Sequence, residues 1–267
     1  MKKWTALILA LLMLLMAAGC QSAGNMPDAD ENHDNPGEVA GDNREDTDEA
    51  SVDRGEVAYE IVEQDNSIRN ENGDILARVS YQQVVLLGDA PEYAAINALI
   101  EQDCLDYLAT SGAYNFTAEE LENMIELNGL GYDSLYDSVY AQVVHNAGGI
   151  FSIRFSVDWF MGGVHNENHY GVTYDVRTGG AAKLNDLMQM SEEEALATLN
   201  AISRDYLVEY YGDALLGDPM DKLSGYTLDD YEYHIDNGEI VVTFVTYEFA
   251  VGAAGPMKIH TGLTVGG

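Results

Sequence analysis

The sequence is poor in positive charge. Its 12 Lys and Arg residues stand against 46 Asp and Glu residues, which gives a formal net charge of −34. A protein that binds nucleic acid neutralises phosphates with Lys and Arg side chains, so this composition argues against nucleic acid as a partner. The same acid excess repels anionic wall polymers and attracts cationic proteins or metal ions.

Cysteine is almost absent as well, since the chain has only Cys20 and Cys104. If Cys20 is consumed by lipidation, Cys104 has no partner and no intrachain disulfide forms. Cys104 lies on an apolar stripe with helical spacing that includes Ile96, Ile100 and Leu108. We therefore expect a buried small hydrophobic residue rather than a reactive thiol.

The chain begins with an apolar run too short to span a bilayer. Ala6–Ala18 contains 13 residues, whereas a spanning helix needs about 20. Lys2 and Lys3 precede this run, as in a secretory signal peptide. The ending "LMAAGC" resembles a bacterial lipobox, which predicts a signal peptide over 1–19 and a lipid on Cys20. The lipid would anchor the protein to the extracytoplasmic side of the cell membrane; ordinary cleavage and release is the alternative.

The segment after the signal peptide has almost no large apolar side chains. From Asp28 to Arg54 it consists mainly of Asp, Glu, Asn and Gly. Such a segment cannot bury enough surface to offset its ordering entropy, so 20–54 is predicted to be an acidic, disordered tether. The remaining residues, 55–267, are enough for one or two small domains.

Apolar periodicity in 55–267 predicts an α+β fold. Alternating runs predict a hairpin over 56–87, antiparallel strands over 134–179, and a hairpin plus a last strand over 231–265. Helical patterns predict helices over 91–110 and 191–211, with a short helical or loop segment over 117–127. Thr117 with Glu120, and Ser191 with Glu194, have the spacing of capping boxes. We therefore expect antiparallel sheets with packed helices, in two small helix-plus-sheet halves.

One motif raises the possibility of a metal site. The stretch "GGVHNENH" places His165, Glu167 and His169 at alternate positions, which share one face if the segment is extended. Two imidazoles and a carboxylate are zinc ligands. The alternative is a tight connection at Gly162 and Gly163 that His165 stabilises by hydrogen bonds.

Signatures of common enzyme classes are missing. The sequence contains no Gly-x-Ser-x-Gly elbow, no phosphate-binding loop and no Ser-x-x-Lys motif. Its 17 tyrosines instead include several at alternating strand positions, such as Tyr136 and Tyr140. They are either half-buried sheet residues or part of a binding face for a glycan or protein.

Four motifs in the second half carry a family resemblance. They are a Gly-Gly-x-His loop at 162–165, an Asp-strand-Thr-Gly turn at 175–179, a Leu-x-Asp-Leu segment at 184–187, and an aromatic-Glu-x-Ala run leading to Ala-Gly-Pro at 247–256. This pattern resembles a bacterial extracytoplasmic domain found in RsiV-like anti-sigma factors and beside PdaC-like polysaccharide deacetylases. The resemblance implies an N-terminal PdaC/RsiV-like α+β domain over 55–160 and a C-terminal RsiV-like domain over 161–267. One departure is Val251-Gly252, where the family tends to have Pro-Tyr.

The resemblance implies a binding role rather than catalysis. We expect a stand-alone, non-enzymatic sensory lipoprotein of the bacterial envelope, without cofactor, that recognises a wall-associated protein or a peptidoglycan fragment. RsiV-like members resemble receptors for basic, lysozyme-type hydrolases, which would suit this acidic chain. The expected ligand-binding residues are Val164, His165, Asn166, Tyr247, Glu248 and Pro256. The alternative is an accessory or degenerate enzyme of wall polysaccharide metabolism that uses a His165, Glu167 and His169 metal site.

Overall fold

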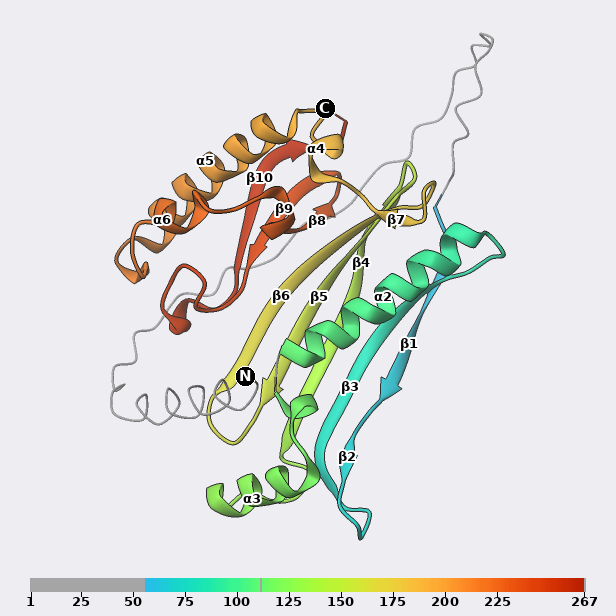
Figure 1. Cartoon of the computed structure of the whole chain (residues 1–267), viewed down its shortest axis with the longest axis vertical. Helices are drawn as coiled ribbons and strands as arrows, with labels where there is room; N and C mark the ends of the chain where they lie inside the picture. The colour runs from blue at the N-terminus through green and yellow to red at the C-terminus, as the bar shows by residue number, and fades with distance from the viewer. Residues whose placement is uncertain (1–55, 111, 267) are drawn as a thin grey trace, which may run out of the picture. The chain divides into compact units, whose positions relative to one another are not determined.

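The computed structural model describes residues 56–110 and 112–266 (Figure 1). The predicted signal peptide, the lipid site at Cys20 and the acidic tether lie outside the described residues. Within the described part, none of the helices combines the length and the apolar character that a membrane crossing needs.

The larger of two sheets has seven strands in the order β1-β3-β4-β5-β6-β7, with β2 also paired to β3. The strands are β1 (Tyr59–Asp65), β2 (Ile68–Arg69), β3 (Ile75–Leu86), β4 (Leu135–Ala147), β5 (Ile150–Phe160), β6 (His165–Asp175) and β7 (Gly180–Ala181). Neighbouring strands are antiparallel except β3 and β4, which are parallel. Parallel neighbours need a long crossover, and here the connection contains two helices. Only antiparallel pairing was predicted from the sequence, and the parallel pair of β3 and β4 corrects that prediction.

Those two helices are α2 (Pro91–Thr110) and α3 (Ala118–Asn128). Helix α2 runs along one face of the large sheet (Figure 1). Its buried stripe includes Ile96, Ile100 and Cys104, which belong to the same core as Phe155 of β5. Burial raises the pKa of the Cys104 thiol to about 12. The predicted burial of Cys104 on a helical stripe is therefore confirmed.

The smaller sheet is antiparallel, with the order β10-β9-β8. Its strands are β8 (Glu232–Asp236), β9 (Glu239–Phe244) and β10 (Met257–Thr264). Helix α5 (Glu192–Tyr211) covers one face of it, and two short helices, α4 (Leu184–Leu187) and α6 (Pro219–Leu223), complete this part (Figure 1). A second hydrophobic core forms here, with Leu199 of α5 packed among Val242 and Ile259 of the sheet. The α+β fold class with packed helices is thus confirmed.

Local signals read from the sequence reappear in the structure. Both capping boxes are present, at Thr117 with Glu120 and at Ser191 with Glu194, and Gly212 follows the last residue of α5. The turn between β8 and β9 uses positive φ at Asn237 (50°) and Gly238 (84°), as a tight hairpin requires.

The two sheets meet where β8 crosses β5 and β6. A Cβ atom at Gly171 of β6 would lie 2.5 Å from the carbonyl carbon of Tyr233, so only glycine allows this close approach. The backbone N–H of Ile235 donates to the Ser152 hydroxyl at 2.9 Å, and Ser152 lies 2.8 Å from the Thr173 hydroxyl. Strands β5 and β6 pair along their full length on either side of residue 160, where the sequence analysis placed a domain boundary. The division into two domains stays a prediction.

Candidate functional site

A row of polar residues crosses five strands of the large sheet. Asp65 lies opposite Ser80, Ser80 opposite Ser138, Ser138 opposite Asp158, and Asp158 opposite Glu167. Directly opposed residues of neighbouring strands share a face. With strands ~4.8 Å apart, the row extends ~19 Å from β1 to β6. The sheet therefore presents a continuous line of carboxylates and hydroxyls.

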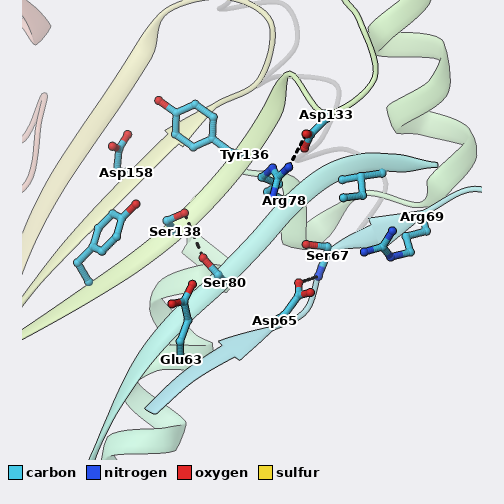
Figure 2. Close-up of a pocket in the computed structure, with 12 residues that line it drawn as sticks. Glu63, Asp65, Ser67, Arg69, Arg78, Ser80, Asp133, Tyr136, Ser138 and Asp158 are labelled. Atoms are coloured by element: carbon cyan, nitrogen blue, oxygen red, sulfur yellow. Dashed lines mark hydrogen bonds and ion pairs between the residues drawn. The ribbon is translucent and has the colours of Figure 1, made fainter. Parts of the chain in front are cut away.

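Four members of the row, Asp65, Ser80, Ser138 and Asp158, line a groove of about 550 Å³ on the sheet (Figure 2). The side walls add Glu63 from β1, Arg78 from β3, and Tyr136 and Tyr140 from β4. Most lining residues are polar, Ile75 is an aliphatic one, and Tyr140 is almost half exposed. Its residues come from strands far apart in the sequence, and the sheet holds them at fixed separation.

Hydrogen bonds within the groove hold several side chains in place (Figure 2). Arg78 pairs with Asp133, and the hydroxyls of Ser80 and Ser138 lie 3.4 Å apart. The backbone N–H of Ser67 donates to Asp65 Oδ1 at 2.9 Å. The Ser67 side chain and this backbone bond lower the pKa of Asp65, which favours its ionised form. The groove thus offers fixed acceptors beside the two guanidinium groups of Arg69 and Arg78.

His165 lies at the β6 end of this groove. Its Nε2 atom is hydrogen-bonded to Asp158 Oδ1, and its ring centroid is 6.3 Å from that of Tyr136. The pKa of the Tyr136 hydroxyl is raised, mainly by burial. The charge of Asp158 and the hydrogen bond between Asp158 and Tyr136 raise it further. A Ser-His-Asp hydrolase needs the imidazole between the serine and the carboxylate. Here Asp158 stands between His165 and Ser138, so these three residues do not have the order of a Ser-His-Asp triad.

The three residues of the metal hypothesis share a face, as expected for an extended segment, but form two separate pairs. His165 pairs with Asp158, whereas His169 Nε2 lies 2.8 Å from Glu167 Oε1. Within residues 56–110 and 112–266, no cluster of three or more His, Cys, Asp or Glu side chains is arranged to hold a metal ion.

The second predicted loop is braced around Glu248. Its carboxylate accepts from Lys222 Nζ at 3.1 Å, from the backbone N–H of Val245 at 3.0 Å, and from the Tyr226 hydroxyl. Pro256 immediately precedes β10. Glu248 therefore acts as a structural anchor of its loop.

Tyr247 has a strained backbone, with φ at 69°, and its side chain is 52 % exposed. A Cβ atom at Gly252 would lie 2.1 Å from the ring, so the ring packs directly on the glycine backbone. Gly252 stands where the resembling family tends to have Tyr. In this protein a side chain at that position would displace the ring of Tyr247. Strain held by packing is typical of functional loops.

The structure brings the two predicted loops together. The backbone N–H of Thr246 donates to Asn168 Oδ1 at 2.8 Å, and the Thr246 hydroxyl donates to the Glu167 carbonyl at 2.9 Å. Val164 immediately precedes β6 and Asn166 is the second residue of β6; Asn166 Nδ2 donates to the Val164 carbonyl at 2.7 Å. The first residues of β6, which the sequence had suggested as a loop, and the segment 245–248 are thus neighbours, and His165 is hydrogen-bonded to Asp158 of the groove.

Of the groove residues, the sequence pointed to Tyr136 and Tyr140 of β4 as possible members of a binding face, but not to Ser138 or to the groove residues on β1 and β3. A signal was present, since Arg78, Ser80, Tyr136, Ser138 and Tyr140 are alternate positions of two predicted strands. Which of these positions face each other depends on the parallel pairing of β3 with β4, for which the sequence has no local signal.

Fold and groove together define an α+β domain with a polar groove across its larger sheet. Among solved structures, it is similar to a member of the DUF3298 family from Bacteroides fragilis, with a TM-score of 0.52 and 14 % sequence identity over 78 % of this chain and 91 % of that one. It is also similar to a DUF3298 family protein from Pseudomonas aeruginosa, with a TM-score of 0.50 and 14 % identity over 77 % of this chain and 90 % of that one. No protein-family model matches the sequence, and no curated protein matches it significantly. The chain therefore shares its fold with DUF3298 family proteins.

Proposed function

We propose that this protein is a non-enzymatic binding or sensory lipoprotein of the bacterial cell envelope. A lipid on Cys20 would hold it at the extracytoplasmic membrane surface, and the groove would recognise a cationic, wall-associated protein. The observation that carries the proposal is the row from Asp65 to Glu167, where five strands align carboxylates and hydroxyls across one face.

Charge favours a cationic partner at two levels. The groove is lined by four carboxylates, from Glu63, Asp65, Asp133 and Asp158, against the two guanidinium groups of Arg69 and Arg78. Arg78 pairs with Asp133, Asp158 pairs with the His165 imidazole, and the charges of Arg69 and Arg78 help to lower the pKa of Asp65. Over the whole of 56–267, 35 of the 46 acidic residues stand against 8 of the 12 Lys and Arg residues. This field steers a basic protein toward the domain and raises its association rate.

The partner in this proposal is a secreted basic hydrolase of the lysozyme type, in keeping with the RsiV-like resemblance. A peptidoglycan fragment is the second candidate, favoured by one observation. The exposed Tyr140 ring lies beside the Ser138 hydroxyl, and an aromatic ring next to hydroxyls suits the apolar and polar faces of a sugar.

The test is a titration of the full-length chain, in mild detergent, with a cationic lysozyme. At about 0.5 M salt the screening length falls to roughly 4 Å, so attraction by net charge alone is largely removed. A specific interface of standard size, about 1,600 Å², retains a desolvated core that salt does not screen. Saturable binding with a defined stoichiometry at this salt is the expected result.

Two variants locate the contact. Asp158→Asn should weaken binding because it removes the carboxylate between His165 and Tyr136, whereas Asp213→Asn, an exposed change outside the groove, should not. A double His165→Ala, Asn166→Ala variant probes the adjoining loop. Absence of saturable lysozyme binding at high salt would reject the lysozyme-type receptor, and saturable binding of a soluble muropeptide instead would favour the second candidate.

A further inference from the structure

Strand β1 is an edge of the large sheet. It pairs with β3, and none of the other described strands pairs with its opposite side. Its sequence, YEIVEQD, contains neither Lys nor Pro, and the register with β3 is regular from Tyr59 to Asp65. Lys, Pro and bulges are the usual devices that block an edge against an added strand. The edge of β1 is therefore geometrically open to pairing.

The register shows which backbone groups point outward. The Leu87 N–H donates to the Ala58 carbonyl at 2.8 Å, and the Asn66 N–H donates to the Val79 carbonyl at 2.7 Å. Hydrogen-bonded pairs alternate along antiparallel strands, so residues of the same parity as 58 and 66 direct their N–H and C=O groups to β3. The N–H and C=O groups of the alternate residues therefore point away from the sheet. These residues are Tyr59, Ile61, Glu63 and Asp65.

The same alternation assigns the side chains of these outward-directed residues to one face. Glu63 and Asp65 line the groove (Figure 2). Strand alternation assigns Tyr59 and Ile61 to the same side of β1, and the Tyr59 ring also makes an edge contact with Phe151 of the core, at 5.6 Å between ring centroids. Tyr59 is 39 % exposed and Ile61 is 46 % exposed. The edge thus presents two apolar side chains followed by two carboxylates, next to backbone groups with which no other strand of 56–110 or 112–266 pairs.

We propose that this edge binds an extended cationic segment of the partner protein as an additional antiparallel strand. The segment would read basic-x-basic-x-apolar-x-apolar from its N-terminus, with the basic residues opposite Asp65 and Glu63 and the apolar residues opposite Ile61 and Tyr59. Main-chain hydrogen bonds provide affinity in this mode, and alternate side chains provide specificity. The inference rests on the proposed function and names the part of the partner that the edge of β1 recognises.

Charge selects this occupant over a second copy of the chain. A second copy would bring its own Glu63 and Asp65 to the edge, together with a net charge of −34, and like charges across strands are destabilising. A basic segment instead places its charges beside the carboxylates of the groove face.

A pair of modified peptides tests the hydrogen-bond pattern. The probe is the capped, fluorescently labelled peptide Lys-Thr-Lys-Thr-Val-Thr-Tyr, titrated with the full-length chain in detergent. N-methylation of the third and fifth residues removes N–H groups directed at β1, and at least a tenfold loss of affinity is expected from two lost hydrogen bonds, at ~1 kcal/mol each, plus the steric clash. N-methylation of the second and fourth residues modifies N–H groups that point away from β1, and should change affinity by no more than about threefold by the same reasoning.

A pair of protein variants tests the face. Glu63→Lys should weaken the unmodified peptide about tenfold, because it places a positive charge opposite a basic residue. Glu60→Lys is the matched control, since Glu60 is exposed on the same strand but belongs to the opposite face, and its effect should stay within about twofold. Thermal melts of both variants establish that each is folded.

The outcomes distinguish strand addition at β1 from the proposed receptor function. Equal binding of both methylated peptides, or equal loss from both Lys variants, overturns strand addition. If lysozyme binds with saturation at high salt while the peptide does not bind, the edge inference is wrong and the proposed function survives. If neither binds, both are wrong.

Discussion

Glu232 offers a quantitative test of how the two sheets are joined. It begins β8, and the backbone N–H of Gly171 in β6 donates to its carboxylate. Burial is the main cause that raises the pKa of Glu232 to about 7, and the charges of Asp103 and Glu248 add to it, while the Gly171 hydrogen bond acts in the opposite direction. An ionised Glu232 is therefore a cost to the folded state at neutral and higher pH.

The sign and size of this cost follow from proton linkage. Between the ordinary pKa of 4.5 and the folded value of about 7, the native state binds more protons than the unfolded state, so stability falls as pH rises through this range. At 1.36 kcal/mol for each pKa unit, the full penalty above the folded pKa is about 3 kcal/mol. Glu232→Gln keeps the shape and the acceptor for the Gly171 N–H but removes the charge.

The variant should therefore be more stable than the wild type by about 3 kcal/mol at pH 8, and by about 1 kcal/mol or less at pH 5. For a domain of this size, the gain at pH 8 corresponds to a rise in Tm of roughly 6–12 °C. Thermal unfolding followed by circular dichroism at both pH values measures it. The control is Glu209→Gln, an exposed change on α5, which should have little effect at either pH. A gain of equal size at pH 5 and pH 8, or no gain at pH 8, would refute the reasoning.

Two further predictions concern the sheet contact and the membrane anchor. Gly171→Ala should destabilise the fold by at least about 2 kcal/mol, because its Cβ would meet the Tyr233 backbone. Gly180→Ala, where a Cβ meets open space, is the matched control, and equal Tm values for the two variants would contradict this contact. Cys20→Ser should abolish labelling by a fatty-acid analogue in cells, and unchanged labelling would reject the lipid anchor.

The sequence by itself determined the local structure, because helix ends and tight turns depend on residues a few positions apart. Ser191 and Glu194 form their capping box three residues apart, and Asn237-Gly238 makes its turn through backbone preference alone. The helical stripe through Cys104 likewise identified a buried helix face. Each signal is contained in a short stretch of chain.

The candidate site was predictable only in part. The Gly-Gly-x-His loop drew attention to His165, but not to Asp158, its hydrogen-bond partner on the preceding strand. Thr246 was not singled out, although it joins the two predicted loops through contacts that span 78 and 79 positions of sequence.

Tertiary structure alone decided the groove and the raised pKa of Glu232. The row from Asp65 to Glu167 exists because β3 pairs in parallel with β4 at one particular register, after a connection that contains two helices. A slip of one residue in that pairing would turn alternate side chains to the other face and break the row. The raised pKa of Glu232 similarly comes from burial between elements that are distant in sequence, which no local pattern of residues encodes.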